Sequence, residues 1–136
     1  MTQTPHIGAI TLFVSDRDEA KRWYGLVFDG LIGTSEPIWE DDVSVVFRIG
    51  TVMVNLLHVS AADEFIAPDP VGGAGTAIRC VATIDVADVD AAVATLRDLG
   101  IEPSLAPVTR PWGPRTANLR DPFGHVWELA TQTPSP

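Results

Sequence analysis

The residue types that usually ligate metals or act as nucleophiles are few and scattered in this 136-residue chain. Its single cysteine is Cys80, and its three histidines are His6, His58 and His125. One cysteine excludes an internal disulfide and a cysteine-based zinc cluster, and its apolar neighbours predict that Cys80 packs in the core. We expect the histidines at the surface or in turns. No nucleophile elbow, phosphate-binding loop or dinucleotide-binding glycine motif is present.

Two of the four tryptophans stand where a large aromatic side chain is costly to expose. Trp39 ends a predicted strand beside three consecutive acids, and Trp112 lies in a loop rich in proline and glycine. A tryptophan in such a place covers the core, an interface or a ligand. Core cover and ligand contact both stay open for each of these two residues. Trp23 and Trp127 are explained by packing, because one lies on the apolar face of a predicted helix and the other lies between packed strands.

The charge balance restricts the class of partner. Nine Lys and Arg residues oppose eighteen Asp and Glu residues, which gives a net charge of −9. A nucleic-acid or anionic-membrane partner needs a basic surface, so both are excluded, whereas a cationic or neutral apolar ligand is allowed. Eleven of the acids and four of the bases fall within residues 1–70, so any attraction for cations is concentrated there. No apolar run is long enough for a membrane span and no signal peptide is visible, which predicts a cytoplasmic protein.

The elements that must position these residues follow one order twice. We expect strands over 8–15, 34–39, 43–49 and 51–59, with a helix over 17–29 capped by Asp16 and ended by Gly30 and Gly33. Ala20, Trp23, Tyr24 and Val27 recur at helical spacing and predict its buried face. Residues 60–76 have the composition of a linker. The second half predicts strands over 77–86, 101–108, 115–120 and 125–131, with a helix from the cap at Asp88 to Leu99. The halves overlay at offsets of 72 and 73, which indicates one β-α-β-β-β unit used twice.

Three motifs carry a resemblance that spans about residues 7–130. They are Val14-Ser15-Asp16 ahead of the helix with Trp23-Tyr24, Asp88-Val89-Asp90-Ala91-Ala92, and the ending 121–129 with the sequence DPFGHVWEL. The chain resembles the vicinal oxygen chelate superfamily of glyoxalases, extradiol dioxygenases and bleomycin-resistance proteins, and is closest in character to the metal-free bleomycin-resistance-like members. The resemblance implies an α+β domain of two βαβββ modules that form curved half-barrel sheets around a shared cleft. Its parts would be module one (about 7–60), a linker (about 61–76), module two (about 77–131) and a short C-terminal tail.

The resemblance also places four metal-ligand positions, which fall here on Ala9, Asn55, Val81 and Glu128. Only Glu128 is a good ligand, because Ala9 and Val81 have no donor atom and Asn55 offers one neutral oxygen. We therefore expect no cofactor. A register slip of one residue would turn Cys80 or His58 inward, so a metal enzyme stays open as an alternative.

Two charged residues of the second half are candidates for contact with a ligand. The guanidinium of Arg115 could hydrogen-bond a ligand oxygen or stack on a ring, although an ion pair with a neighbouring acid is the favoured interpretation. A buried Glu128 must be protonated or paired. It could accept a ligand donor, act as a general base or pair with an arginine.

The sequence thus predicts metal-independent binding of a small planar aromatic or cationic molecule by a homodimer, as in antibiotic resistance of the bleomycin-resistance type. The candidate ligand-binding residues are Phe13, Trp39, Phe47, Asn55, Leu57, Trp112, Arg115 and Glu128. The alternatives are a metal-dependent lyase, isomerase or dioxygenase with an unusual ligand set, and metal-free proton transfer with Glu128 as the base.

Overall fold

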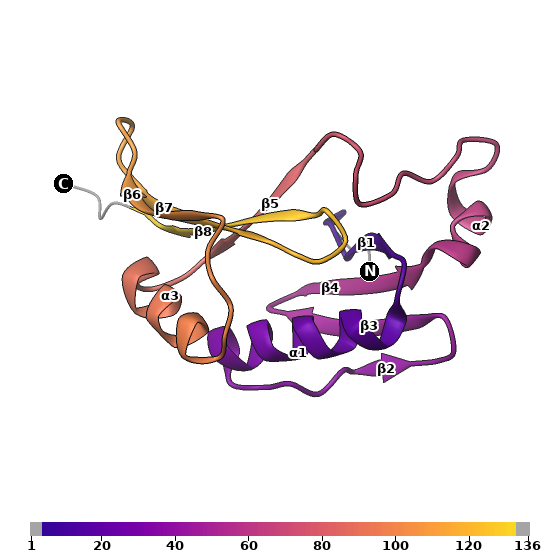
Figure 1. Cartoon of the computed structure of the whole chain (residues 1–136), viewed down its shortest axis with the longest axis horizontal. Coiled ribbons are helices and arrows are strands. Elements are labelled where there is room, and N and C mark those ends of the chain that lie inside the picture. Colours follow the sequence, from indigo (N-terminus) through magenta and orange to yellow (C-terminus); the bar gives the residue numbers. More distant parts are fainter. Residues whose placement is uncertain (1–3, 133–136) are drawn as a thin grey trace. The chain divides into compact units, whose positions relative to one another are not determined.

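The computed structural model describes residues 4–132, and the end of the predicted C-terminal tail (133–136) lies outside the described residues. The chain forms two compact units (Figure 1). The described part of unit 1 consists of residues 4–25 and 36–72, and that of unit 2 consists of residues 26–35 and 73–132. Among residues 4–132, no helix has both the length and the apolar character that crossing a bilayer requires.

Unit 1 holds a four-stranded sheet in the order β1-β4-β3-β2. Its elements are β1 (Ala9–Val14), the first part of α1 (Arg17–Ile32), β2 (Trp39–Glu40), β3 (Ser44–Ile49), β4 (Val52–His58), the 3-10 helix η1 (Val59–Ala61) and α2 (Asp63–Ile66). β1 pairs in parallel with β4, and the other neighbours are antiparallel. The parallel pair is joined through the helix and two further strands, as a parallel connection requires.

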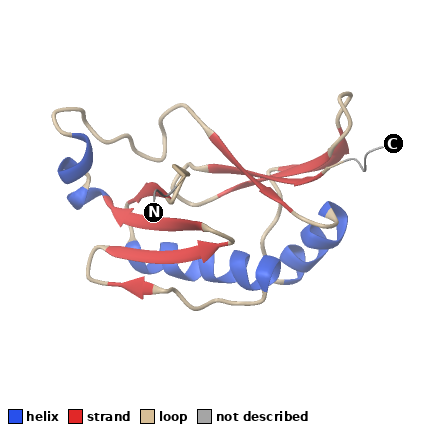
Figure 2. Ribbon diagram, turned by 180° about the vertical axis from the view of Figure 1, so that it is seen from behind, coloured by secondary structure: helices blue, strands red, loops and turns tan. Residues whose placement is uncertain are grey.

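Unit 2 repeats this plan with the order β5-β8-β7-β6 (Figure 2). Its elements are β5 (Val81–Asp85), α3 (Val89–Asp98), β6 (Leu105–Thr109), β7 (Arg115–Arg120) and β8 (Val126–Thr131). Asp88 caps α3 by accepting a hydrogen bond from the backbone N–H of Ala91 at 3.1 Å. The predicted fold class is therefore confirmed as α+β with two βαβββ modules. The two sheets are separate and neither closes into a barrel.

Helix α1 begins where the sequence predicts and ends later. The Asp16 side chain accepts the Glu19 N–H at 3.0 Å, and Ala20, Trp23, Tyr24 and Val27 are buried as expected. Gly30 lies inside the helix, where a Cβ would approach Leu96 Cδ2 at 3.0 Å, so this glycine serves close packing between α1 and α3. The helix ends at Gly33, whose φ of +78° is the left-handed conformation that favours glycine.

Two local predictions, for residues 34–39 and Cys80, were wrong, and the expected linker contains short helices. The strand expected over 34–39 is reduced to Trp39–Glu40 at the edge of the sheet. The expected linker holds η1 and α2. Cys80 is exposed rather than buried, because β5 begins only at Val81 and the preceding residues pair with no strand.

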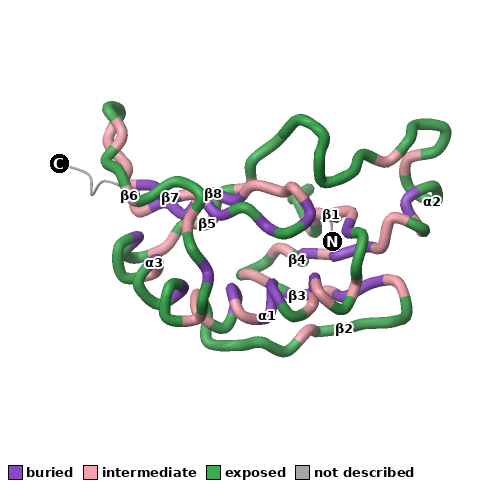
Figure 3. Tube along the Cα trace, viewed as in Figure 1, coloured by how far each residue is buried: buried purple, intermediate pink, exposed green. Residues whose placement is uncertain are grey.

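Each sheet has one face toward helices and one face away from them, and most of the exposed strand residues lie on the face away from the helices (Figure 3). In unit 1, Val45, Phe47, Val54 and Leu56 form the buried side. Glu40 pairs with Val45 across β2 and β3 and reaches Arg17 and Lys21 of α1, so this side faces α1. In unit 2, the ring of Trp127 lies 6.5 Å from that of Phe28. Val89, at the start of α3, donates to Thr131. We call the opposite side of each sheet, which points away from α1 or α3, the distal face.

Candidate functional site

One row of side chains crosses the distal face of unit 1. Strand pairing places Trp39 beside Val46, Val46 beside Asn55, and Asn55 beside Thr11. Paired residues in a sheet point to the same side, so these four side chains share the distal face. The Oδ1 atom of Asn55 is buried and has no hydrogen-bond partner within residues 4–132. Trp39, at the edge, is 56% exposed.

The matching row of unit 2 carries more polar groups. Pairing places Leu105 beside Asn118, Asn118 beside Glu128, and Glu128 beside Thr83. The Thr83 hydroxyl donates to Glu128 Oε1 at 3.0 Å. The Oδ1 atom of Asn118 is buried and lacks a hydrogen-bond partner in the described part of the chain. Two acceptor groups, an amide oxygen and a carboxylate, therefore lie side by side on neighbouring strands.

The adjacent row on each distal face carries an arginine. Arg48 lies opposite Met53 in unit 1, and Arg120 lies opposite Val126 in unit 2. Both arginines are exposed. Neither forms an ion pair with another described residue.

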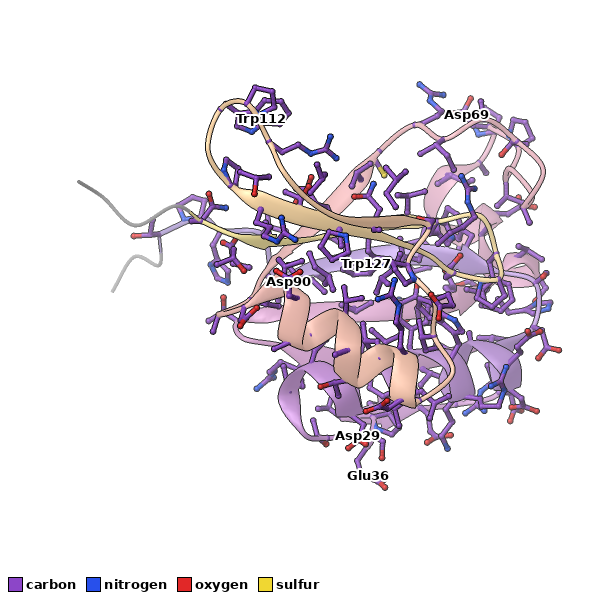
Figure 4. All side chains as sticks on the ribbon, turned by 60° about the vertical axis from the view of Figure 1, so that its left-hand side comes forward. Asp29, Glu36, Asp69, Asp90, Trp112 and Trp127 are labelled. Carbon is purple, nitrogen blue, oxygen red and sulfur yellow. The ribbon has the colours of Figure 1, made fainter. Side chains whose placement is uncertain are left out.

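Trp112 belongs to the distal side of unit 2. It is 72% exposed at the tip of the β6–β7 hairpin, on the side of the sheet away from α3, whereas Asp90 marks the start of α3 (Figure 4). The Arg110 guanidinium lies 5.8 Å from the Trp112 ring centre, which is a cation–π contact. Arg110 Nε also donates to the hydroxyl of Thr116 at 2.9 Å. Thr116 pairs with Ala130 on the distal face, so Arg110 connects the exposed indole to that face.

Arg115 lies on the opposite side of the same sheet. It pairs with Thr131, and its guanidinium binds the Asp90 carboxylate through two hydrogen bonds of 2.5 and 2.9 Å. These bonds lower the pKa of Asp90 and raise that of Arg115. The favoured interpretation, an ion pair with a neighbouring acid, is confirmed. As a ligand contact, Arg115 would have to leave this pair.

The remaining predicted contacts of unit 1 lie at different depths. Phe13 pairs with Leu57, and both side chains lie on the distal face with Asn55, Phe13 partly exposed and Leu57 buried. Phe47 pairs with Val54 and is 1% exposed, which places it in the core toward α1. Its ring is therefore on the wrong side of the sheet to meet a ligand beside Asn55.

The acidic run of unit 1 is occupied by structural roles. Together with Ser15, Asp16, Arg17, Asp18 and His58, residues 40–42 line an open depression. Hydrogen bonds from Lys21 and Arg17 lower the pKa of Glu40. The Asp41 carboxylate accepts hydrogen bonds from Val43 and Ser44, which lower its pKa. Two of the three acids thus hold α1 and the β2–β3 turn.

Sequence analysis missed Asn118 and Thr83. Both flank Glu128, but the place of Asn118 depends on strand register across the 121–125 loop, and that of Thr83 depends on the register of the parallel pair β5–β8. The signal available in the sequence was the amide at position 118 inside a strand with apolar neighbours. An amide in such a place needs a hydrogen-bond partner or a ligand.

Residues 6–129 match one protein family, described as the Glyoxalase/Bleomycin resistance protein/Dioxygenase superfamily. The chain belongs to this superfamily. No curated protein gave a match.

Solved structures of the superfamily share the fold. A glyoxalase/bleomycin resistance protein/dioxygenase from Nocardioides has a TM-score of 0.77 at 19% identity, covering 100% of this chain and 89% of that chain. A glyoxalase-related enzyme from Fulvimarina pelagi has a TM-score of 0.75 at 20% identity, covering 95% and 89%. Lactoylglutathione lyase from Agrobacterium tumefaciens has a TM-score of 0.71 at 25% identity, covering 95% of each chain.

The residues at the four ligand positions implied by the superfamily do not fit a divalent metal. Ala9 and Val81 carry only hydrocarbon, Asn55 offers one neutral oxygen, and the Glu128 carboxylate accepts a hydrogen bond from Thr83. A hard divalent cation seeks about six oxygen ligands. Within residues 4–132, no three His, Cys, Asp or Glu side chains are grouped so that they could hold a metal ion.

Proposed function

We propose that this member of the superfamily binds and sequesters a small planar aromatic or cationic molecule without a metal. The observation that carries the proposal is the donor set at Ala9, Asn55, Val81 and Glu128, which cannot complete a coordination sphere. The biological consequence we propose is antibiotic resistance of the bleomycin-resistance type, in the cytoplasm.

Each distal face, taken by itself, offers groups that suit such a ligand. Trp39 and Trp112 present exposed indoles, and an indole stacks on planar rings and attracts cations. Asn55, Asn118 and Glu128 present acceptor oxygens. Exposed apolar side chains, including Val81 and Leu105, supply surface for a ring system.

Titration of intrinsic tryptophan fluorescence tests this proposal. Planar aromatic antibiotics that damage DNA are added to the protein as purified and to protein treated with a chelator. We expect saturable quenching with the same affinity in both samples, because binding needs no metal. Trp112→Leu and Trp39→Leu, measured separately by calorimetry, should each weaken binding. The same change at Trp23, which is buried against Tyr24, is the control for an effect on packing alone. A broad panel without saturable binding would refute the proposal.

We also propose that the protein is a homodimer, as the resemblance implies. Sedimentation at micromolar concentration measures this directly. A single species of 14.6 kDa would contradict it.

A metal-dependent lyase is the second candidate function. It is favoured by the likeness to the Agrobacterium tumefaciens protein named lactoylglutathione lyase, which is 25% identical. Elemental analysis after reconstitution with divalent ions separates the two functions. One tightly bound ion per chain, with turnover that depends on it, would establish the lyase and overturn sequestration.

A further inference from the structure

We propose that Asn118 and Glu128 form a subsite for an organic cation that carries N–H donors, that is, an amidinium, guanidinium or primary ammonium group. This inference rests on the proposed function and names the part of the ligand that unit 2 recognises.

The geometry brings two acceptor groups together. Asn118 on β7 and Glu128 on β8 are direct cross-strand partners on the distal face. Cβ atoms of such partners lie about 4.5–5.5 Å apart, so one small group can reach both side chains. An amidinium presents several N–H donors in one plane and can address an amide oxygen and a carboxylate at once.

The acceptor oxygens of Asn118 and Glu128 outnumber the hydrogen-bond donors that the described residues direct to them. The Thr83 hydroxyl has one hydrogen, and that hydrogen is directed to Glu128 Oε1. Asn118 Oδ1 is buried and receives no hydrogen bond from any described residue. Buried amide oxygens are nearly always satisfied in folded proteins. A donor from a ligand would remove this deficit.

The charged neighbours on the distal face leave the pair available. Arg120 lies one row away and makes no ion pair with Glu128 in the described structure. Arg110 is engaged with Thr116 and Trp112. Asp85, on the same side of β5, accepts a hydrogen bond from Gln132. Near the subsite, the distal face therefore carries two carboxylates, Glu128 and Asp85, and one arginine, Arg120, that forms no ion pair within residues 4–132.

Unit 1 lacks this arrangement and gives an internal contrast. The cross-strand partners of Asn55 are Val46 on β3 and Thr11 on β1, so no second amide or carboxylate lies directly beside its oxygen. The paired acceptors, and with them the preference for several N–H donors, are specific to unit 2.

The test is an NMR titration of the whole chain with four fragments that share one ring. Benzamidine has a cation with N–H donors, benzamide has donors without charge, benzyltrimethylammonium has charge without donors, and benzoate is an anion. We expect benzamidine to shift the Asn118 side-chain amide and the β8 backbone resonances at the lowest concentration. Benzamide and benzyltrimethylammonium should each need roughly ten times more, because each lacks half of the interaction.

Variants separate a binding role from a structural one. Glu128→Gln and Asn118→Leu, each similar in shape to the native residue, should weaken benzamidine binding about tenfold. Asn118→Asp should strengthen it about fivefold by adding a carboxylate, and a merely structural role would not produce this gain. Arg120→Gln should also strengthen binding, because it removes the competing cation. Thr95→Asp is the matched control for Asn118→Asp. It adds the same charge at an exposed position of α3, on the other side of the sheet.

The outcomes distinguish this inference from the proposed function. If planar antibiotics bind but benzamidine binds no better than benzamide, or Asn118→Asp and Glu128→Gln leave its affinity unchanged, the subsite is refuted and sequestration stands. If benzamidine binds with the expected variant pattern while no antibiotic in the panel binds, the subsite stands and the proposed class of ligand is wrong.

Discussion

The corresponding rows of paired residues on the two distal faces are alike at some positions and differ at others. From edge to edge, the unit 1 row is Trp39, Val46, Asn55 and Thr11, and the unit 2 row is Leu105, Asn118, Glu128 and Thr83. Both rows have a threonine on the parallel edge strand, an acceptor on the next strand and an apolar residue at the far edge. The remaining position, between the acceptor and the far edge, is apolar in unit 1 (Val46) and polar in unit 2 (Asn118). A neighbouring row places an arginine in both units, at Arg48 and Arg120.

The comparison separates scaffold from recognition. The threonine, the acceptor beside it and the neighbouring arginine are repeated, whereas the residue on the next strand (Val46 or Asn118) and the edge residue (Trp39 or Leu105) differ in type. Unit 1 supplies an exposed indole in its row, and unit 2 supplies paired acceptors. A duplicated unit can diverge in this way because distal-face residues contribute little to the packing against the helices.

The helix-facing cores differ in where the bulk lies. In unit 1 the large side chain is Phe47 on β3, beside Val54. In unit 2 it is Trp127 on β8, beside Leu119. In both units a large aromatic side chain fills the helix-facing side, but it comes from β3 in unit 1 and from β8 in unit 2.

The largest expected effect comes from emptying the core position of unit 1. Phe47→Ala should lower the free energy of unfolding by about 3–5 kcal/mol, because it leaves a cavity in a fully buried site. Trp39→Ala, on the neighbouring strand β2 but exposed on the opposite face, should cost under about 1 kcal/mol. Urea denaturation followed by circular dichroism measures both. Phe47→Leu serves if the alanine variant does not fold. Similar losses for Phe47 and Trp39 would contradict the assignment of the two faces.

The β3–β4 and β7–β8 turns give the next effect. Gly50 and Gly124 both have positive φ, at +58° and +91°, but only Gly124 faces backbone, since a Cβ would lie 2.7 Å from the Ala74 carbonyl oxygen. Gly50→Ala should cost about 1–2 kcal/mol for conformation alone. Gly124→Ala should cost about 2–4 kcal/mol, because residue 74 must move as well. Equal losses of the free energy of unfolding would show that the 73–76 segment does not pack on the Gly124 turn.

Replacing Asn118 of the unit 2 row by the residue at the equivalent place in unit 1 should stabilise the protein. Asn118→Val removes a buried oxygen that lacks a hydrogen bond and inserts the residue found at the equivalent place in unit 1. We expect a gain of about 1 kcal/mol in the free energy of unfolding, together with weaker benzamidine binding. The reverse change, Val46→Asn, is the matched control and should destabilise. A loss of stability in Asn118→Val would mean that the amide has a structural partner.

Most of the architecture could be predicted from the sequence, because its signals are local. The caps at Asp16 and Asp88, the glycines at 33 and 50, and the alternation within β4 and β8 each specify structure within a few residues. The lengths of edge strands were harder to predict from the sequence. β2 has two residues because pairing with β3, and not its own composition, determines its length.

The candidate site depended on register, and register is not local. Counting across the two-residue turn at Gly50 pairs Phe47 with Val54, so its place in the core was within reach of sequence analysis. Asn118 was harder, because the 121–125 loop allows several registers. The Asp121 carboxylate fixes one of them by accepting the N–H groups of Phe123 and His125 at 2.9 and 2.8 Å. Only the folded loop therefore shows that an amide lies beside Glu128.

The smallest expected effect concerns the ion pairs that tie each sheet to its helix. Arg115 lowers the pKa of Asp90 in unit 2, and Lys21 and Arg17 lower that of Glu40 in unit 1. A carboxyl with a lowered folded pKa stabilises the fold above its ordinary pKa, and that contribution is lost as the pH falls through the folded value. Arg115→Gln should therefore lower the Tm slightly near neutral pH, and the difference from wild type should shrink as the pH falls below 3.8 and through the lowered pKa of Asp90.

Arg17→Gln should lower the Tm by a smaller amount, because Lys21 still pairs with Glu40. This difference in Tm should shrink as the pH falls below 4.5 and through the lowered pKa of Glu40. Arg120→Gln, which removes an arginine without an ion pair in the described structure, is the control and should show no such dependence on pH. Calorimetric scans across this acid range measure all three variants. A Tm difference for Arg115→Gln that persists well below pH 3.8 would show that the arginine acts by packing against α3 rather than through the charge of Asp90.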